Sequence, residues 1–285
     1  MSDVSDITQK LDHILRTSIS NTAFQPANER AAILRTFIGR IIVLDGIPCS
    51  GKTHLGRTLR DYFTENGIAA IFLEEKINKQ HLGRFYAAMK RGESPNPHSF
   101  PLQLCAMHEC IQIYKEAVWY AGRGPGGGKP HVVIIDRPIW GNRVFEQLQV
   151  AKGNITQEEH EIYDSYIVKH GPYLFDHLVY LYTSPEKAHH RVLHVRKHTE
   201  EADMPLEYLW ELQRTYFIHI HKHVVQGDRA LCVIANDDAY VSAEGVIDTL
   251  LKHRMPPKIK RSSEDLIRTK EVSTVFADWC DHYAQ

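Results

Sequence analysis

The sequence predicts an α/β fold in which helices cover both faces of a parallel sheet. Five short apolar runs have the length of strands: residues 40–44, 69–73, 131–135, 177–182 and 231–235. Segments with helical periodicity separate them, at lengths that suit the crossovers between parallel strands. The run Val132-Val133-Ile134-Ile135 is continuously apolar, as expected of a strand that is buried on both faces. We therefore expect one three-layer domain with a five-stranded parallel sheet.

Composition excludes several classes of protein. The chain has 285 residues and a net charge of −1, so nothing in its bulk charge attracts nucleic acid or an anionic membrane. Its 18 histidines are scattered, without metal-ligand spacing. The five cysteines are odd in number and lack C-x-x-C spacing, which favours a reduced, cytoplasmic protein. No apolar run approaches membrane-spanning length and no signal-peptide pattern opens the chain, so we expect a soluble protein.

The first strand leads into a complete G-x-x-x-x-G-K-T loop, which consists of Gly46, Ile47, Pro48, Cys49, Ser50, Gly51, Lys52 and Thr53. A stretch with helical periodicity follows, so the motif has the strand before it and the helix after it that phosphate binding requires. The two glycines let the backbone wrap a polyphosphate, whose oxygens accept N–H groups at the start of the helix. Lys52 would reach the β- and γ-phosphates, and Thr53 would offer its hydroxyl to Mg²⁺. We expect an ATP site.

Carboxylates follow two of the other strands. Asp136 comes directly after the third strand, and because the phosphate loop opens at the same edge of the sheet, Asp136 should face the bound Mg²⁺. Arg137 or the metal would compensate its charge. Glu74 and Glu75 follow the second strand. Phosphoryl transfer to a hydroxyl needs a base, and Glu74 is the candidate, since on an extended chain Glu75 would point away and be solvated.

The flanking segments divide the chain into three parts. We expect an N-terminal extension at 1–38, a phosphate-loop domain at 39–254 and a C-terminal extension at 255–285, which begins near Met255-Pro256-Pro257. The glycine-rich segment at 122–130 precedes a strand and not a helix, so it is expected to be a linker. The cationic segment at 191–201 is either a lid that covers phosphates or a solvated helix face.

In order and spacing, residues 40–240 resemble the deoxynucleoside kinase family. The matching segments are the phosphate loop, Leu82-Gly83-Arg84-Phe85-Tyr86, Ser99-Phe100-Pro101-Leu102-Gln103, Asp136-Arg137-Pro138, the lid from Arg196 to Glu201 with Met204-Pro205-Leu206-Glu207-Tyr208 after it, and Ala235-Asn236-Asp237-Asp238. The resemblance implies a kinase fold with a lid, ATP and Mg²⁺ as cofactors, and a nucleoside as the acceptor. Members of the family are commonly dimers, so a homodimer is also implied.

The resemblance assigns roles to individual residues. Glu74 resembles the base that takes the 5′-hydroxyl proton, with Arg137 beside that hydroxyl. Lys52 and Arg196 would clamp the transferred phosphate, and Thr53 and Asp136 would hold Mg²⁺. The remaining assignments concern the two substrates: Tyr86 and Glu201 on the sugar, Gln103 on the base edge, and Asp237 in the loop against the adenine of ATP.

Three departures from the family pattern affect these expectations. Pro138 replaces a serine or histidine, and His198 stands where the lid would carry its second arginine. Where relatives that prefer deoxycytidine or purines have an arginine and an aspartate that read the base, this chain has Cys110 and Asn142. A less charged base site favours thymidine, or a broad range of bases.

Two alternatives stay open. A thymidylate-type nucleoside monophosphate kinase shares the sheet and the loop, but it needs arginines for the acceptor phosphate, and none follows a strand end between Thr53 and Pro97. A nucleotide-binding regulator with little catalysis would also fit Pro138, His198 and the two extensions.

Overall fold

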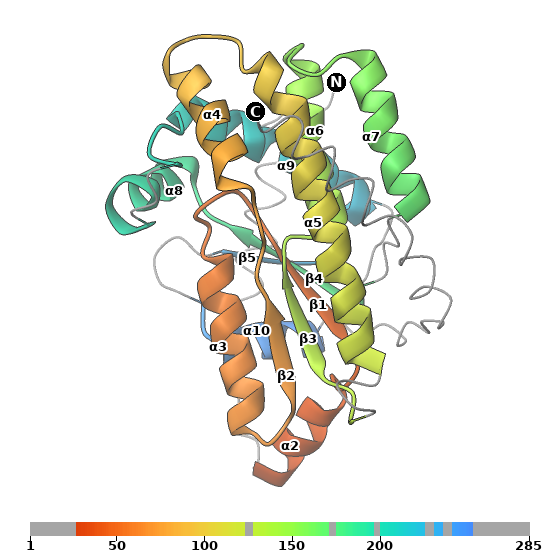
Figure 1. The fold of residues 1–285 in the computed structure, drawn as a ribbon. Coiled ribbons are helices and arrows are strands. Elements are labelled where there is room, and N and C mark those ends of the chain that lie inside the picture. Colours follow the sequence, from red (N-terminus) through yellow and green to blue (C-terminus); the bar gives the residue numbers. More distant parts are fainter. Residues whose placement is uncertain are drawn as a thin grey trace.

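The computed structural model describes residues 27–122, 128–170, 175–196, 200–225, 231–235 and 241–252. Its strands are β1 (Ile41–Asp45), β2 (Ala70–Leu73), β3 (Val132–Asp136), β4 (His177–Tyr182) and β5 (Leu231–Ala235). They lie in the order β2-β3-β1-β4-β5, and all four pairings are parallel. The central strands β1 and β3 are fully buried, because helices cover them from both sides (Figure 1).

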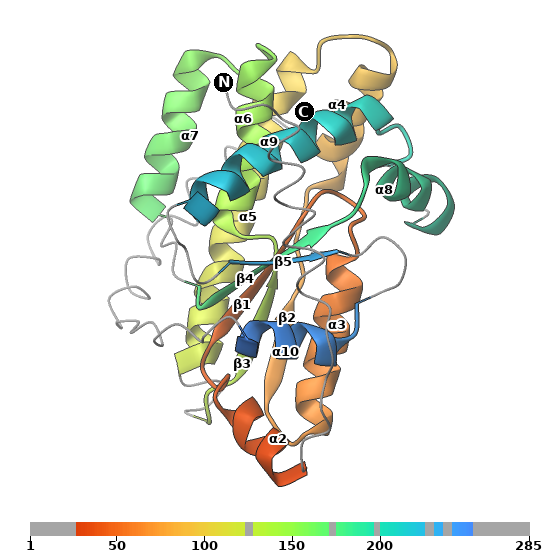
Figure 2. The same cartoon turned by 180° about the vertical axis from the view of Figure 1, so that it is seen from behind.

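Alternate strand residues supply the two halves of the core. Ile42 and Leu44 of β1 pack with α2 (Ala27–Arg35), α3 (Lys52–Glu65) and α10 (Ala243–Lys252). Ile41 and Val43 face the other layer, which contains α4 (Lys79–Lys90), α5 (Asn96–Gly122), α6 (Ile139–Ala151), α7 (Gln157–His170), α8 (Pro185–Arg191) and α9 (Leu206–Val225). A π-helical segment, η2 (Val192–Arg196), continues α8. Figures 1 and 2 show α5 and α10 on opposite sides of the sheet.

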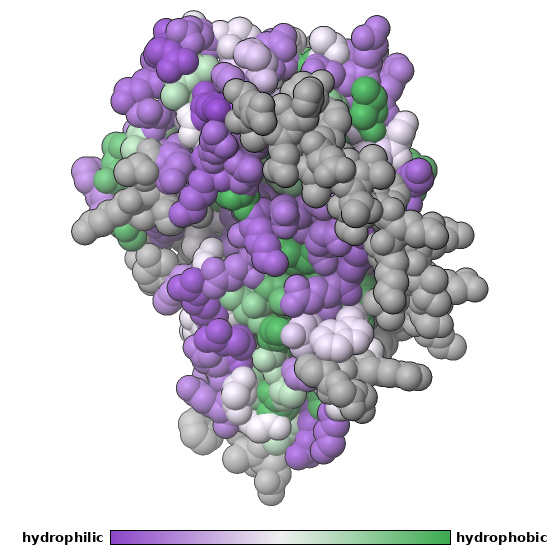
Figure 3. All heavy atoms as spheres, in the orientation of Figure 1, coloured by the Kyte–Doolittle hydropathy of each residue, from purple (hydrophilic) through white to green (hydrophobic). Residues whose placement is uncertain are grey.

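The predicted α/β architecture with helices on both faces is therefore confirmed, with strand ends displaced by one residue at most. Helix α4 begins at Lys79, where the Asn78 side chain accepts the N–H groups of Gln80 and His81. Among the described residues, no helix is long and apolar enough to cross a membrane. Hydrophilic residues dominate the described part of the face drawn in Figure 3.

The segment before residue 39 contributes to the core. Leu34 and Phe37 are fully buried. Arg30 donates hydrogen bonds to the Tyr62 hydroxyl at 3.0 Å and to the Asp248 carboxylate at 2.7 Å, and so joins α2 to α3 and α10. The division of the chain at residues 38 and 254 stays a prediction, and residues 255–285 lie outside the described residues.

Candidate active site

A cavity of about 860 Å³ opens at the carboxyl edge of the sheet. Most of the residues that the sequence singled out line it: Pro48, Cys49, Gly51, Lys52, Thr53, Glu74, Tyr86, Gln103, Asp136, Arg137, Asn142 and Glu201. The first and last of them, Pro48 and Glu201, lie 153 positions apart, and the parallel sheet brings them together because its strand ends share one edge. Three residues of the phosphate loop do not line the cavity: Gly46, and Ile47 and Ser50, which are fully buried.

The backbone of the phosphate loop has the conformation that its glycines allow. Gly46 and Gly51 have φ values of 144° and 97°. A Cβ on Gly46 would lie 2.6 Å from the Leu181 carbonyl oxygen, so no larger residue fits. Cys49 also has a positive φ, 60°, which costs energy for a residue other than glycine. The loop is therefore held in its curved form before the first turn of α3.

Lys52 lies inside this loop and is almost completely buried. Its ammonium donates to the carbonyl oxygens of Gly46 at 3.1 Å and of Ile47 at 3.0 Å. Burial, and then the neighbouring Arg137, lower the pKa of Lys52 from its ordinary value. The two carbonyl groups compensate the positive charge of Lys52 only in part. An anion bound in the cavity would complete that compensation.

Thr53 and Asp136 meet across the cavity floor. The Thr53 hydroxyl donates to Oδ2 of Asp136 at 2.9 Å. The other oxygen, Oδ1, is buried and has no hydrogen-bond partner in the part of the chain that the structure describes. Burial raises the pKa of Asp136, against the effect of Lys52. A hydroxyl and a carboxylate oxygen with free capacity are the donor types that Mg²⁺ prefers, so these residues fit the ion.

Arg137 contacts several buried groups of the site. Its Nε donates to Oε1 of Glu75 at 2.7 Å, and its Nη1 donates to the Tyr216 hydroxyl at 2.8 Å. The guanidinium also lies 4.4 Å from the ring centroid of Phe145. Burial acts to lower the pKa of Arg137, but Glu75, Tyr216 and Asp45 together hold it above its ordinary value. Arg137 has a φ of 69°, a strained conformation of the kind that is found at functional sites.

The expectation for the two glutamates after β2 is wrong in one respect. Glu75 was expected to be solvated, but it lines the cavity and pairs with Arg137, with a quarter of its side chain exposed. Glu74 also lines the cavity, yet it is half-exposed and pairs with Arg57 at 2.8 Å. The two side chains do alternate, since Glu74 lies on the α3 side, as Phe72 does, and Glu75 lies on the opposite side, as Leu73 does. The expectation assigned the buried side of the chain to the wrong glutamate.

The residues expected on the nucleoside side are buried along one part of the cavity. Tyr86 packs edge-on against Phe85 and Tyr208, with ring centroids 5.2 and 5.9 Å apart. Gln103 of α5 and Asn142 of α6 are also buried. Cys110 lies on the same helical stripe of α5 as Gln103 and donates its thiol to the Arg137 carbonyl at 3.5 Å. Burial raises the pKa of this thiol to about 12, so Cys110 is neutral.

The lid is described in part. Glu201 is buried and lines the cavity. Arg196 ends η2, but its side chain lies outside the described residues, as do His198 and Asp237. Arg191, to which the sequence assigned no role, lines the cavity and donates to the Cys49 carbonyl at 3.2 Å. The sequence offered no signal for this contact with the phosphate loop.

The sequence also gave no reason to single out Asp45, the last residue of β1. Its carboxylate is fully buried and accepts hydrogen bonds from the Gly46 N–H at 2.7 Å and from the Tyr216 hydroxyl at 2.8 Å. Burial raises the pKa of Asp45 to about 6, although Arg137 and Lys52 act to lower it. At neutral pH this carboxylate is therefore mostly ionised.

Comparison with known proteins agrees with this geometry. The deoxynucleoside kinase family matches residues 42–271. No curated protein matches the chain. Among solved structures, deoxyadenosine kinase from M. mycoides with dCMP and a flexible dCDP bound has a TM-score of 0.52 at 18% identity, over 74% of this chain and 96% of that one. The same enzyme with dCTP gives 0.51 at 15% identity, over 85% and 99%. With dATP it gives 0.50 at 18%, over 75% and 96%.

Proposed function

Because the chain belongs to the deoxynucleoside kinase family, we propose that it transfers the γ-phosphoryl group of ATP to the 5′-hydroxyl of a deoxynucleoside. The products are a 5′-monophosphate and ADP. The observation that carries this proposal is that one cavity contains both Lys52 of the phosphate loop and the Glu75–Arg137 pair. A hydroxyl acceptor loses a proton as it attacks, and a carboxylate in the same cavity as the phosphate loop is suited to accept it.

On the phosphate side, the loop N–H groups and Lys52 hold the polyphosphate of ATP. The hydroxyl of Thr53 and the free oxygen of Asp136 would hold Mg²⁺, which neutralises phosphate charge when bound. Arg191 anchors the start of the lid on the loop. The roles proposed for Arg196, in clamping the transferred phosphate, and for Asp237, beside adenine, rest on the resemblance alone.

On the acceptor side, we assign the role of catalytic base to Glu75 in place of Glu74. Glu75 is held by the buried Arg137, whereas Glu74 extends to the surface and pairs with Arg57. Because Arg137 occupies one oxygen of Glu75, the carboxylate has a defined orientation before the acceptor binds. The hydroxyl of the acceptor would donate to Glu75, and its proton would pass to that carboxylate as the new O–P bond forms.

The nucleoside is recognised by buried polar groups. Tyr86 and Glu201 are proposed to contact the sugar, and Gln103 the edge of the base. The side chains of Cys110 and Asn142 are uncharged, so the cavity wall near Gln103 is neutral. A neutral wall supports thymidine, or a broad range of bases, over bases that relatives read with charged side chains. The homodimer and the cytoplasmic location stay predictions.

A matched pair of variants tests the assignment of the base. Glu75→Gln keeps the size of the side chain but cannot accept the proton, so kcat should fall by at least about 100-fold. Glu74→Gln removes only an exposed ion pair, so kcat should stay within about threefold of wild type. Steady-state rates of ADP formation with Mg²⁺ and ATP measure both, with circular dichroism as the control for folding. Loss of activity in Glu74→Gln alone would return the base to Glu74.

The reaction class is tested with the wild-type protein. The four natural deoxynucleosides and their 5′-monophosphates are each incubated with ATP and Mg²⁺, and the products are separated by chromatography. Monophosphate formed from a nucleoside supports the proposal. Diphosphate formed only from a monophosphate would identify a nucleoside monophosphate kinase, and no product from any acceptor would favour a regulator.

A further inference from the structure

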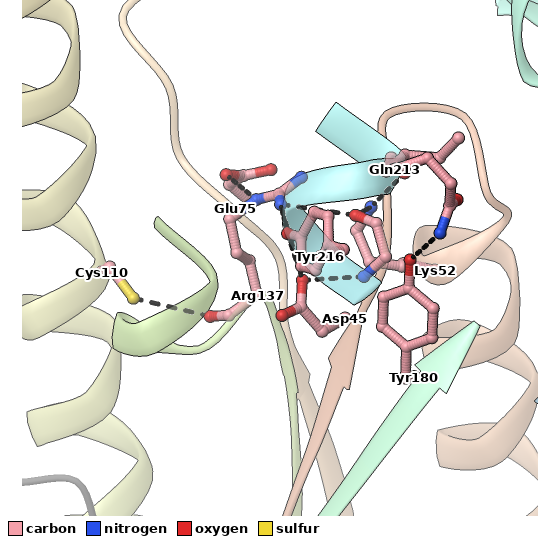
Figure 4. Close-up of polar contacts among 10 residues, drawn as sticks. Asp45, Lys52, Glu75, Cys110, Arg137, Tyr180, Gln213 and Tyr216 are labelled. Carbon is pink, nitrogen blue, oxygen red and sulfur yellow. Dashed lines mark hydrogen bonds and ion pairs between the residues drawn. The ribbon is translucent and has the colours of Figure 1, made fainter. Parts of the chain in front are cut away.

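Two buried side chains lie behind Arg137, on the side away from Glu75 (Figure 4). The Tyr216 hydroxyl accepts a hydrogen bond from Nη1 of Arg137 at 2.8 Å and donates one to Oδ1 of Asp45 at 2.8 Å. The same Nη1 lies 3.5 Å from that carboxylate oxygen. Neither Asp45 nor Tyr216 lines the cavity, so both act at a distance from any bound substrate.

The surroundings of Asp45 are unfavourable for a carboxylate that serves packing alone. Its side chain is fully buried, and its Oδ2 has no hydrogen-bond partner within the described ranges of the chain. A Cβ added to Gly141 of α6 would lie 2.4 Å from this oxygen, so α6 approaches the carboxylate through a glycine. Burial of an ion with one unsatisfied oxygen costs free energy, and an uncharged residue would avoid that cost.

We propose that Asp45 and Tyr216 are positioning residues, which hold the guanidinium of Arg137 so that its Nε fixes the orientation of the Glu75 carboxylate. This inference rests on the proposed function, in which Glu75 is the base. Arginine has a long side chain with many rotamers, and contacts at Nη1 and Nε together define the plane of its guanidinium. Nη1 also donates to the Gly46 carbonyl at 3.4 Å, so loss of either contact loosens that plane without freeing it.

The positioning contacts also join separate elements of the fold. Asp45 ends β1, Arg137 follows β3, and Tyr216 belongs to α9, which also carries Tyr208 of the cavity wall. Asp45 accepts the N–H of Gly46 as well, so the same carboxylate contacts the phosphate loop. One buried carboxylate, that of Asp45, therefore aligns the proposed catalytic base Glu75 with the phosphate loop.

A matched pair of tyrosine variants separates positioning from packing. Tyr216→Phe removes only the hydroxyl that contacts Arg137. The control is Tyr180→Phe, since Tyr180 is equally buried, lies 5.3 Å from Tyr216 between ring centroids, and accepts a hydrogen bond from Gln213 at 2.8 Å. Tyr216→Phe loses two buried hydrogen bonds, with Arg137 and Asp45, and Tyr180→Phe loses one, with Gln213. The urea unfolding midpoint should therefore fall in both variants, and further in Tyr216→Phe.

Their kinetics should differ. In Tyr216→Phe, kcat should fall about tenfold, the size expected for one hydrogen bond to a charged group, with KM for ATP and nucleoside within about twofold. Tyr180→Phe should keep kcat within about twofold. In the Glu75→Gln background, Tyr216→Phe should cause no further loss, because both changes act on one group. Equal kcat losses in the two tyrosine variants, or additive losses in the double variant, would overturn the proposal.

A spectroscopic measurement keeps this inference separate from the proposed function. In ¹⁵N-labelled protein, the Nε–H signal of Arg137 is identified by its absence in Arg137→Lys. Its exchange with solvent should accelerate in Tyr216→Phe and in Asp45→Asn but not in Tyr180→Phe, whether or not any nucleoside is phosphorylated. Asp45→Asn keeps the oxygen that accepts from Tyr216 and Gly46 and loses the charge. Unchanged exchange in Tyr216→Phe and Asp45→Asn would refute the positioning role.

Discussion

Replacement of Asp45 by asparagine should stabilise the protein more at pH 8 than at pH 5. Burial raises the pKa of Asp45 from an ordinary value of 3.8 to about 6, against Arg137, Lys52 and the Tyr216 hydroxyl, which favour the charged form. The folded state therefore binds this proton more tightly than the unfolded state. Well below pH 3.8 the carboxyl is protonated in both the folded and the unfolded state, and its ionisation costs no stability. The loss of stability from burying the ionised form grows as pH rises towards 6 and reaches its full size above pH 6.

The magnitude follows from the two pKa values. A difference of about 2 pH units corresponds to about 3 kcal/mol at full ionisation. About half of this cost, roughly 1.5 kcal/mol, develops between pH 5 and pH 8, since at pH 5 the unfolded chain is already ionised and the folded one is not. Asparagine resembles the protonated form in size and cannot ionise. The free energy of unfolding of Asp45→Asn minus that of wild type should therefore grow by about 1.5 kcal/mol over this range.

Urea unfolding followed by tryptophan fluorescence at pH 5, 6, 7 and 8, at constant ionic strength, measures this difference. Comparison of the variant with wild type at each pH cancels the titration of the groups that do not interact with Asp45. A difference that does not change with pH would show that the folded and unfolded pKa values of Asp45 are equal. A difference that shrinks as pH rises would show that Arg137 and Lys52 outweigh burial, and would refute the reasoning.

Two further predictions concern packing and metal binding. Gly56→Ala should destabilise the protein by about 1–2 kcal/mol, because the new Cβ would lie 2.2 Å from the Phe72 ring and the cost of overpacking exceeds the gain in helix propensity. The control is Gly83→Ala in α4, where the nearest atom to the new Cβ is 3.8 Å away. This variant should be neutral or stabilising in the same urea assay. Thr53→Ala should raise the Mg²⁺ concentration for half-maximal rate about tenfold without a change in nucleoside KM, since one ligand is lost; an unchanged Mg²⁺ dependence would remove Thr53 from the metal site.

Local sequence patterns were sufficient to predict the secondary-structure elements and to place the residues that directly follow a strand. The phosphate loop, Asp136 and Arg137 all lie within one or two positions of a buried apolar run, so their place at the sheet edge follows from strand direction. Gln103 and Asn142 could be placed on the same cavity only through the family resemblance. Glu75 was misplaced because alternation predicts that Glu74 and Glu75 face opposite sides, as they do, but does not show which of them faces Arg137.

The sequence alone determined the α/β class and the nucleotide site, because apolar strands and the G-x-x-x-x-G-K-T spacing are short-range features whose geometry is dictated by the backbone. Only the tertiary structure decided which glutamate faces Arg137 and what holds Arg137 in place. The contact between Asp45 and Tyr216 joins residues 171 positions apart. Such a contact depends on how α9 packs against the end of β1, and no pattern within either segment specifies that packing.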